Sequence, residues 1–418
     1  MNKKLQFFTL LLVNIFSISS LQAAIDMQAH LATDEAQEAY TSYLSQQSSY
    51  YTGNYTYTTL LAQTGDQLFG SLNTLMGNTC KLEAWGLDYG DLRYAYTDVD
   101  RDLNKSGNII GYYDGYSFAG KWDSGNTWNR EHTWPQSKGA NKDIPMGHDM
   151  QSVRPTRKAA NSDRGNTAYG EGGSYYDPDE ISINNSAYKK INLGTYRGDA
   201  ARVIMYDYIV YGQAGSYKNS LYNGNAQLLN KLGSSGVFES LRIMLKWHMQ
   251  DPPSLTEMVR NDGAQAYQGN RNPFIDFPEF AIQIFLNNSN IKTHKVKVNT
   301  SATLWPNYQY TLSDGFIAYL TEADGSRPES VDVTGATYSY DATMGRLTIT
   351  NVTSDMVIST NGITAIDDIY YSNKIVIYNI TGTIIAEISS ENLSSTLQTL
   401  PSGLYIIQQG NQARKIMR

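Results

Sequence analysis

Three adjacent side chains in the first half of the chain have the chemistry of a hydrolytic site. The segment Trp128–Ser137 reads WNREHTWPQS, so a guanidinium, a carboxylate and an imidazole stand on the consecutive residues Arg130, Glu131 and His132. An imidazole can take a proton from water near neutral pH, a carboxylate can hold a hard divalent cation, and an arginine can neutralise phosphate charge. The chain has only five histidines. The cluster suggests phosphodiester hydrolysis, and for three residues taken alone a solvated charged face is the open alternative.

A second polar segment favours the hydrolytic interpretation. It is His148–Asn166, with the sequence HDMQSVRPTRKAANSDRGN. Together the two segments resemble the bacterial endonuclease I family, secreted or periplasmic nucleases of the ββα-metal class, whose pattern is N-R-E-H-x-W-P, then D-L-H-H-L-x-P, then N-x-x-R-x-N. Further matches extend the resemblance from about residue 50 to about residue 285: Arg197–Arg202, Asp251–Pro253 and Gln268–Asp276.

The resemblance implies a role for each matched residue. His132 would be the general base, and Glu131 and Asn161 would be the protein ligands of one Mg²⁺, with Ca²⁺ or Mn²⁺ as alternatives. Few protein ligands and many waters suit Mg²⁺. Three arginines are candidates for phosphate contact, with the last two ranked higher because they lie inside matched segments: Arg130, Arg154 and Arg164. Contacts to phosphate carry no sequence information, so a nonspecific endonuclease acting on DNA, and on RNA as well, is expected.

One departure from the family pattern affects this interpretation. Where the family has two histidines after Asp-Leu, this chain has Gln151 and Ser152. Glutamine can form hydrogen bonds but cannot titrate, and His148 lies three residues too early to replace the pair directly. A catalytically weak or inactive nuclease-like protein that binds at the cell surface is therefore the competing hypothesis. A zinc protease is excluded as a third class because the chain has no H-E-x-x-H motif.

The site needs a local framework that brings its residues together. We predict a strand ending in WNREH, with a bulge or a strand-to-loop break at 130–133, because neighbouring side chains on a regular strand point to opposite faces. A second strand over 149–153 and a helix that starts at Pro155 and carries Asn161 would complete a ββα module.

The surrounding elements are predicted from local patterns. Helical spacing predicts a helix over 197–211, and Ser254 with Glu257 predicts a capping box for a helix over 255–268. A strand is expected over 93–97. The late segment with Arg271 is assigned to packing, and His248 to the core or the surface instead of a ligand role.

Composition and pattern shifts predict the domain organisation. The chain has 418 residues and 41% hydrophobic residues, enough for more than one core. We predict an α+β protein: a mixed helical nuclease domain over 24–290 with the ββα-metal module, a small β spacer domain over 291–362, and a β-sandwich-like domain over 363–418. The last segment, with LPSGLY and a basic end, resembles the C-terminal sorting domain of type IX secretion.

Charge and export signals refine the picture. The formal net charge is −7, yet Gly120–Asn166 holds eight Lys and Arg against five acids, a local excess of +3 that suits phosphate. Residues 1–23 have a charged start, an apolar run and a small residue at the end, as a signal peptide does. With no later apolar run of membrane-spanning length and Cys80 as the single cysteine, we expect a secreted or surface-located monomer without disulfides, exported by the type IX machinery and acting on nucleic acid.

Overall fold

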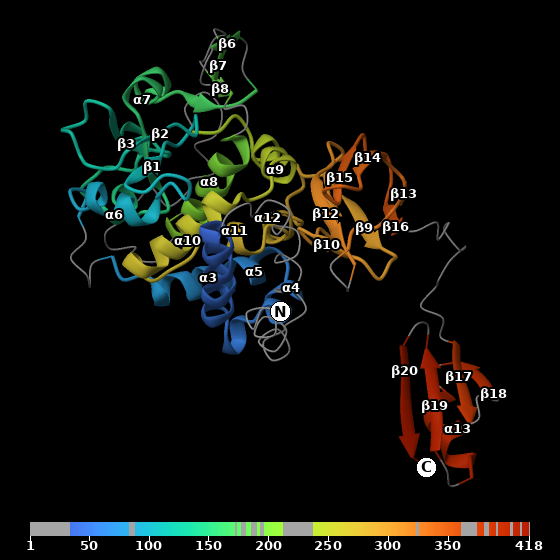
Figure 1. Cartoon of the computed structure of the whole chain (residues 1–418). Helices are drawn as coiled ribbons and strands as arrows, with labels where there is room; N and C mark the ends of the chain where they lie inside the picture. Colours follow the sequence, from blue (N-terminus) through green and yellow to red (C-terminus); the bar gives the residue numbers. More distant parts are fainter. Residues whose placement is uncertain are drawn as a thin grey trace, which may run out of the picture. The chain divides into compact units, whose positions relative to one another are not determined.

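The structure, a computed structural model, describes residues 34–82, 88–171, 174–176, 181–184, 190–192, 196–211, 237–322, 326–360, 374–379, 384–389, 392–401, 404–409 and 412–417. The chain divides into two compact units, one up to Asn361 and one from Gly362. Helices and several small sheets make up the first unit (Figure 1), in agreement with the predicted α+β class. The predicted signal peptide lies outside the described residues, and the predicted division into four segments stays a prediction.

Helix α8 (Arg197–Tyr211) is the centre of the helical part. Its bounds are those predicted, and nearly all its residues are buried, as expected for a helix surrounded by others. Helices α5 (Gly65–Thr79), α9 (Leu241–Gln250) and α11 (Pro273–Asp276) contact it, and α12 (Phe280–Ile284) packs on α5. The apolar stripe of α5 faces this core through Leu68, Leu72 and Leu75.

Helix α10 (Leu255–Gln268) begins with the predicted capping box. The Ser254 hydroxyl accepts from the Glu257 backbone N–H, and the Glu257 carboxylate accepts from the Ser254 N–H. The same carboxylate forms a two-point ion pair with Arg202 of α8, with both N–O distances 2.7 Å. One residue therefore both starts α10 and fixes it to the central helix.

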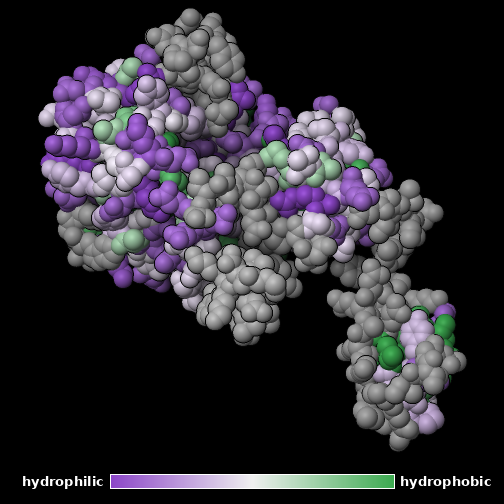
Figure 2. Space-filling view, viewed as in Figure 1, coloured by the Kyte–Doolittle hydropathy of each residue, from purple (hydrophilic) through white to green (hydrophobic). Residues whose placement is uncertain are grey.

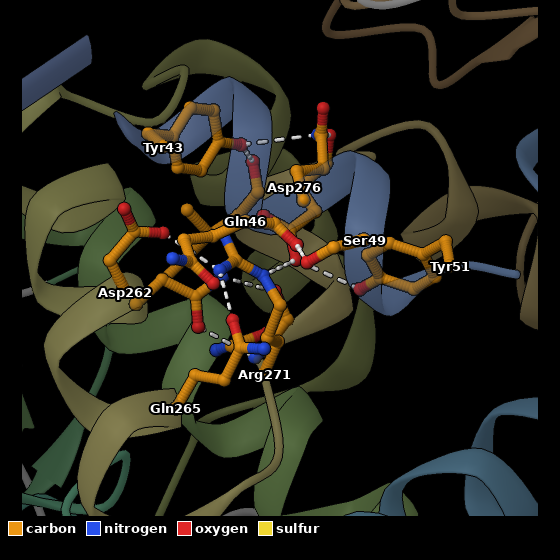
Figure 3. A network of polar contacts seen from close by, with 12 residues as sticks. Tyr43, Gln46, Ser49, Tyr51, Asp262, Gln265, Arg271 and Asp276 are labelled. Atoms are coloured by element: carbon orange, nitrogen blue, oxygen red, sulfur yellow. Dashed lines mark hydrogen bonds and ion pairs between the residues drawn. The ribbon is translucent and has the colours of Figure 1, made fainter. Parts of the chain in front are cut away.

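Arg271 links the segment after helix α3 to the end of the helical part (Figure 3). Its guanidinium is fully buried and donates to Asp276 at 2.8 Å and to Asp262 at 2.7 Å. Tyr51, just beyond helix α3 (Asp34–Tyr50), donates to the same Asp276 carboxylate at 2.9 Å. The packing role predicted for this late segment is confirmed.

The strand expected over 93–97 is wrong, because helix α6 (Leu92–Val99) lies there. The sequence RYAYT has strand-favouring tyrosines and a threonine, which suggested alternation. The residues that are buried, however, are Leu92, Ala95, Tyr96 and Val99, at the spacing of one helix face. Packing against α10 outweighed the local preference.

Two strands and a helix form the framework around the predicted site. Strand β3 (Trp128–His132) pairs antiparallel with β4 (Val153–Arg157), and α7 (Lys158–Arg164) follows directly. The second strand therefore lies four residues later than predicted, and Pro155 stands inside it instead of starting the helix. Proline is tolerated because β4 pairs with a single strand. The pairing is regular through His132, so no bulge forms, and the strand ends there.

Short strands complete the part of the first unit around the predicted site. Strands β1 (Asn108–Ile110) and β2 (Ser117–Ala119) form a hairpin beside β4. A four-stranded sheet has the order β5-β8-β7-β6, with the strands Ala168–Tyr169, Lys190–Asn192, Ile181–Asn184 and Ser174–Tyr176. The small helix α4 (Tyr57–Leu61) precedes α5.

The residues from 294 to 360 form two four-stranded sheets. One has the order β10-β12-β15-β14 (Thr303–Trp305, Ile317–Thr321, Arg346–Thr350, Thr337–Asp341), and the other β11-β9-β16-β13 (Tyr310–Thr311, His294–Val298, Met356–Thr360, Val331–Thr334). Their buried residues belong to the same core as those of α5 and α8. Asp314 lies against α9, where Gln250 donates to its carbonyl at 3.3 Å. This part packs on the helices as a continuous structure.

The second unit is a single antiparallel sheet with the order β18-β17-β19-β20. Its strands are Lys374–Asn379, Ile384–Ser389, Leu404–Gln409 and Gln412–Met417 for β17 to β20, and α13 is Leu393–Thr399. Leu393 and Leu397 of α13 pack on Ile375 and Ile407. A helix-covered sheet thus stands in the described residues where a sandwich-like domain was expected.

The visible face of the first unit is mainly hydrophilic, with scattered apolar residues (Figure 2). In the described part of the chain, no helix has the length and apolar character needed to cross a membrane.

Candidate active site

Arg164 at the end of α7 fixes the end of strand β3. Its side chain has no exposed surface, and it donates to the carbonyls of His132 and Thr133, both at 2.8 Å. It also donates to the carbonyl of Thr167 at 3.1 Å and to Oε1 of Glu131 at 2.6 Å. Four hydrogen bonds from one planar guanidinium hold the backbone at the point where the two candidate catalytic side chains leave it.

Glu131 is a buried carboxylate with its charge balanced by Arg164. The residue is 2% exposed, and burial raises its pKa against the opposing effects of Arg164 and the Tyr113 hydroxyl. Both of its hydrogen bonds, from Arg164 and from Tyr113 at 2.5 Å, reach Oε1. Among the described residues, Oε2 accepts no hydrogen bond, so one carboxylate oxygen is left for a ligand.

The imidazole of His132 is held in one tautomer by a backbone carbonyl. Its Nε2 lies 3.0 Å from the carbonyl oxygen of Gly147, which can only accept, so Nε2 carries the hydrogen and Nδ1 carries the lone pair. The Gln136 amide lies 3.5 Å from Nδ1. Burial lowers the pKa of His132 to about 4, so the ring is neutral at neutral pH, as a general base must be.

Asn161 lies over the same face of β3 as Glu131. Its Nδ2 donates to Oδ1 of Asn129 at 2.7 Å and lies 3.4 Å from the carbonyl of Arg130. Asn129 and Glu131 share a strand face because they are two residues apart. With its amide nitrogen so engaged, the Asn161 side-chain oxygen accepts no hydrogen bond from the described residues.

These two oxygens fit a hard divalent cation. Mg²⁺ and Ca²⁺ bind carboxylate and amide oxygens, and Mg²⁺ keeps most of its waters. In the part of the chain that the structure describes, no group of three or more His, Cys, Asp and Glu residues could hold a metal ion. The resemblance implied Glu131 and Asn161 as the protein ligands, and the donor chemistry of their two oxygens agrees with that.

The three arginines expected to contact phosphate have different environments. The guanidinium of Arg130 lies 3.7 Å from the Tyr89 ring centroid and 5.3 Å from that of Trp122, and its side chain is partly exposed. Arg154 is 5% exposed, lies 3.7 Å from the Asp100 carboxylate and stacks on Tyr112.

This ranking is the reverse of the one from sequence. Arg154 and Arg164 were placed first, but both are buried, and Arg164 already uses its donors on the protein. Of the three, Arg130 alone is partly exposed and so is the best placed to meet a phosphate, with one guanidinium nitrogen already donating to the Tyr89 carbonyl.

The residues that replace the family's histidine pair point into the polar core. Gln151 is 1% exposed and donates to Asn261 of α10 at 2.8 Å, and Ser152 is 2% exposed and donates to Asp207 of α8. His148 lies apart from both, with Nδ1 3.4 Å from the Lys142 carbonyl. His248 is fully buried and its Nε2–H donates to the Pro278 carbonyl oxygen at 2.8 Å. Burial lowers its pKa to about 3, and the prediction of a core or surface position is confirmed as a core position.

Several residues that were not predicted from the sequence complete the site. Gly147 supplies the carbonyl that holds His132, and a Cβ there would meet the Asn141 carbonyl oxygen at 1.9 Å. Tyr113 reaches Glu131, and Tyr89 lies over His132 with ring centroids 5.2 Å apart. None of these three residues lies within the two polar segments, although Gly147 directly precedes the second one. No local sequence pattern marks them, because they reach the site only through the tertiary fold.

A neutral buried imidazole on the residue that follows a charge-balanced carboxylate, on a frame of two paired strands and a helix, has the chemistry to activate water for hydrolysis. A family model described as Endonuclease I matches residues 64–279, more than half of the chain, and the chain belongs to that family. It is therefore a nuclease-type hydrolase.

Two curated relatives agree with this assignment. Both carry the name extracellular ribonuclease, one from Bacillus subtilis (strain 168) and one from Bacillus amyloliquefaciens. The first is 31% identical over 239 residues and the second 31% over 238, and each alignment covers 53% of this chain and 75% of the relative.

Proposed function

We propose that this protein is a secreted, nonspecific endonuclease that hydrolyses phosphodiester bonds in DNA and RNA with the help of a divalent cation. The observation that carries the proposal is the contact of His132 Nε2 with the Gly147 carbonyl oxygen at 3.0 Å, which sets the tautomer of the ring. His132 is the last residue of its strand, and the residue before it is the charge-balanced carboxylate Glu131.

In the proposed reaction, Nδ1 of His132 takes the proton of the attacking water. The new bond forms between that water's oxygen and phosphorus, and the bond to the 3′-oxygen breaks. Glu131 and Asn161 would hold the cation, Mg²⁺ with Ca²⁺ or Mn²⁺ as alternatives, and the cation would supply positive charge that stabilises the phosphate and the leaving oxygen. Arg130 contacts a substrate phosphate. Arg154 and Arg164 support the framework from inside the protein.

The substrate class rests on charge and on similarity. Phosphate contacts do not read bases, the relatives are named ribonucleases, and the family model is an endonuclease. Activity on both nucleic acids follows if recognition stops at the backbone.

Plasmid and RNA digestion tests the proposal. Wild-type protein should nick supercoiled DNA and cut RNA in Mg²⁺, and EDTA should stop both. His132→Ala should lower the rate by about 10²- to 10⁴-fold, whereas His294→Ala, a histidine in strand β9, should cut like wild type. Folded wild-type protein that cleaves neither substrate in Mg²⁺, Mn²⁺ or Ca²⁺ would sink the enzyme proposal and leave a nuclease-like surface binder.

Export forms a separate part of the proposal. The relatives are named extracellular, and residues 1–23 and 363–418 are proposed to direct export through type IX secretion to the surface or the medium. Deleting residues 363–418 in a host with that system should retain the protein inside the cell envelope. Unchanged nuclease activity in the medium would refute this role.

A further inference from the structure

Tyr113 has a backbone conformation that a residue with a Cβ rarely adopts. It lies just after β1 with φ of 77°, and its side chain is fully buried. Glycine occupies this region without a steric penalty, and glycines stand nearby at positions 111 and 115. A bulky residue kept at positive φ points to a use for its side chain.

The hydroxyl of Tyr113 connects two groups of the site. It lies 2.5 Å from Oε1 of Glu131 and in hydrogen-bond contact with the hydroxyl of Tyr169. An ionised carboxylate only accepts, and a phenol has one proton. Tyr113 therefore donates to Glu131, and its oxygen can accept from Tyr169, whose single proton lies between the Tyr113 oxygen and the Thr133 carbonyl.

The donors to Glu131 converge on one oxygen. Arg164 donates to Oε1 at 2.6 Å, from the side of α7, and Tyr113 donates to the same atom from the segment after β1. Two donors on one oxygen fix the rotation of the carboxylate plane, whereas either one alone leaves it free to pivot. Oε2 then has one direction, and no described residue donates to it.

The position of Tyr169 is itself fixed. Its ring carries the guanidinium of Arg164 at 4.4 Å from the centroid, and its hydroxyl also lies 3.3 Å from the Thr133 carbonyl. The two tyrosines and Arg164 form one closed set of contacts around the end of β3.

We propose that Tyr113, backed by Tyr169, is a positioning residue that orients the Glu131 carboxylate so that its second oxygen serves the divalent cation. The inference rests on the proposed function, because Glu131 must be a metal ligand for its orientation to matter. Outer partners of metal ligands commonly change metal affinity by 10- to 100-fold when removed.

Direct binding of Mn²⁺, measured by electron paramagnetic resonance on the full chain, tests the role without depending on catalysis. Tyr113→Phe removes the hydroxyl and keeps the ring. Tyr96→Phe is the matched control, since Tyr96 is also fully buried and donates to a backbone carbonyl, that of Val153, at 3.1 Å. Plasmid cleavage as a function of Mg²⁺ concentration is measured alongside.

Tyr113→Phe should weaken Mn²⁺ binding by roughly 10-fold and raise the Mg²⁺ concentration for half-maximal cleavage by a similar factor. The rate at saturating Mg²⁺ should recover. Tyr169→Phe should shift affinity in the same direction by less, and Tyr96→Phe should stay within about twofold of wild type.

The outcomes separate the two levels of the argument. If Glu131→Gln abolishes Mn²⁺ binding but Tyr113→Phe binds like wild type, the positioning role is refuted and the proposed function stands. If wild type binds no Mn²⁺, or Glu131→Gln binds it normally, the metal assignment fails and the positioning role fails with it.

Discussion

Replacing Arg164 with methionine separates a structural arginine from a phosphate-binding one. The side chain has 0% exposure and pairs with Glu131 at 2.6 Å. Methionine matches its length but leaves the Glu131 carboxylate buried without its counter-charge. Removing one partner of a buried ion pair costs about 3–5 kcal/mol of unfolding free energy, and the carbonyls of His132 and Thr133 lose their donor as well. We expect a loss in that range.

Urea denaturation followed by circular dichroism measures the loss. In a double-mutant cycle, Glu131→Gln with Arg164→Met should be more stable than the sum of the single losses predicts, by about 1–3 kcal/mol, because the unpaired charge is gone. Arg130→Met is the matched control for Arg164→Met. It should cost only about 1 kcal/mol through its aromatic contacts and should weaken nucleic-acid binding.

The salt dependence of binding to a nucleic acid decides between the two roles. Removing an arginine that contacts phosphate reduces the steepness of log affinity plotted against log salt concentration by about 1. We expect that change for Arg130→Met and not for Arg164→Met. If Arg164→Met lost less than about 1 kcal/mol of stability and lowered the slope, the assignment of Arg164 as a buried structural arginine would be refuted.

Three further perturbations test other parts of the structure. Gly147→Ala should lower the cleavage rate by more than 10-fold, because its Cβ would meet the Asn141 carbonyl oxygen at 1.9 Å and displace the carbonyl that holds His132; a rate equal to wild type would contradict this. Burial raises the pKa of Asp251 to about 6, so the folded protein binds its proton more tightly than the unfolded chain, and the unfolding free energy should fall by up to about 3 kcal/mol as pH rises from 4 to 7. In Asp251→Asn that fall should be smaller in denaturation measured across this range, and an unchanged profile would count against it. Ser254→Ala should cost about 1 kcal/mol in the same assay by removing the N-cap of α10, and no loss would show that the cap contributes nothing.

Local sequence signals predicted those helices whose ends and buried faces are determined by residues close together in the sequence. Helix α8 has the predicted bounds, and α10 begins at its capping box, because caps and helical spacing act within a few residues. The helix α6 was missed since its burial depends on α10, far along the chain. The late placement of β4 has a similar cause: a proline can sit in a strand with one neighbour, and only the pairing with β3 reveals that.

The candidate site was predictable in residue type and less so in geometry. The motif pattern named Glu131, His132 and Asn161 as candidates, and their roles stay predictions; the structure shows a buried carboxylate, a buried neutral imidazole and an amide held by Asn129 at these positions. Exposure is a tertiary property, so nothing in the sequence could distinguish the buried Arg164 from the partly exposed Arg130. Tyr113 likewise lies 18 residues from the carboxylate that it contacts, and no motif links the two.

The environment of Gln151 and Ser152 changes what their departure from the family pattern means. Both side chains are buried and point toward α8 and α10, and neither contacts the His132 ring. Asp207, which accepts from Ser152, has its pKa raised by burial, and the serine hydroxyl is a small neutral donor that fits beside it. A histidine there would add volume and a second titratable group to a filled core, at a cost in stability. Gln151 and Ser152 therefore fit the polar core between the site and the central helix, and the ring of His132, the proposed general base, is oriented by the Gly147 carbonyl instead.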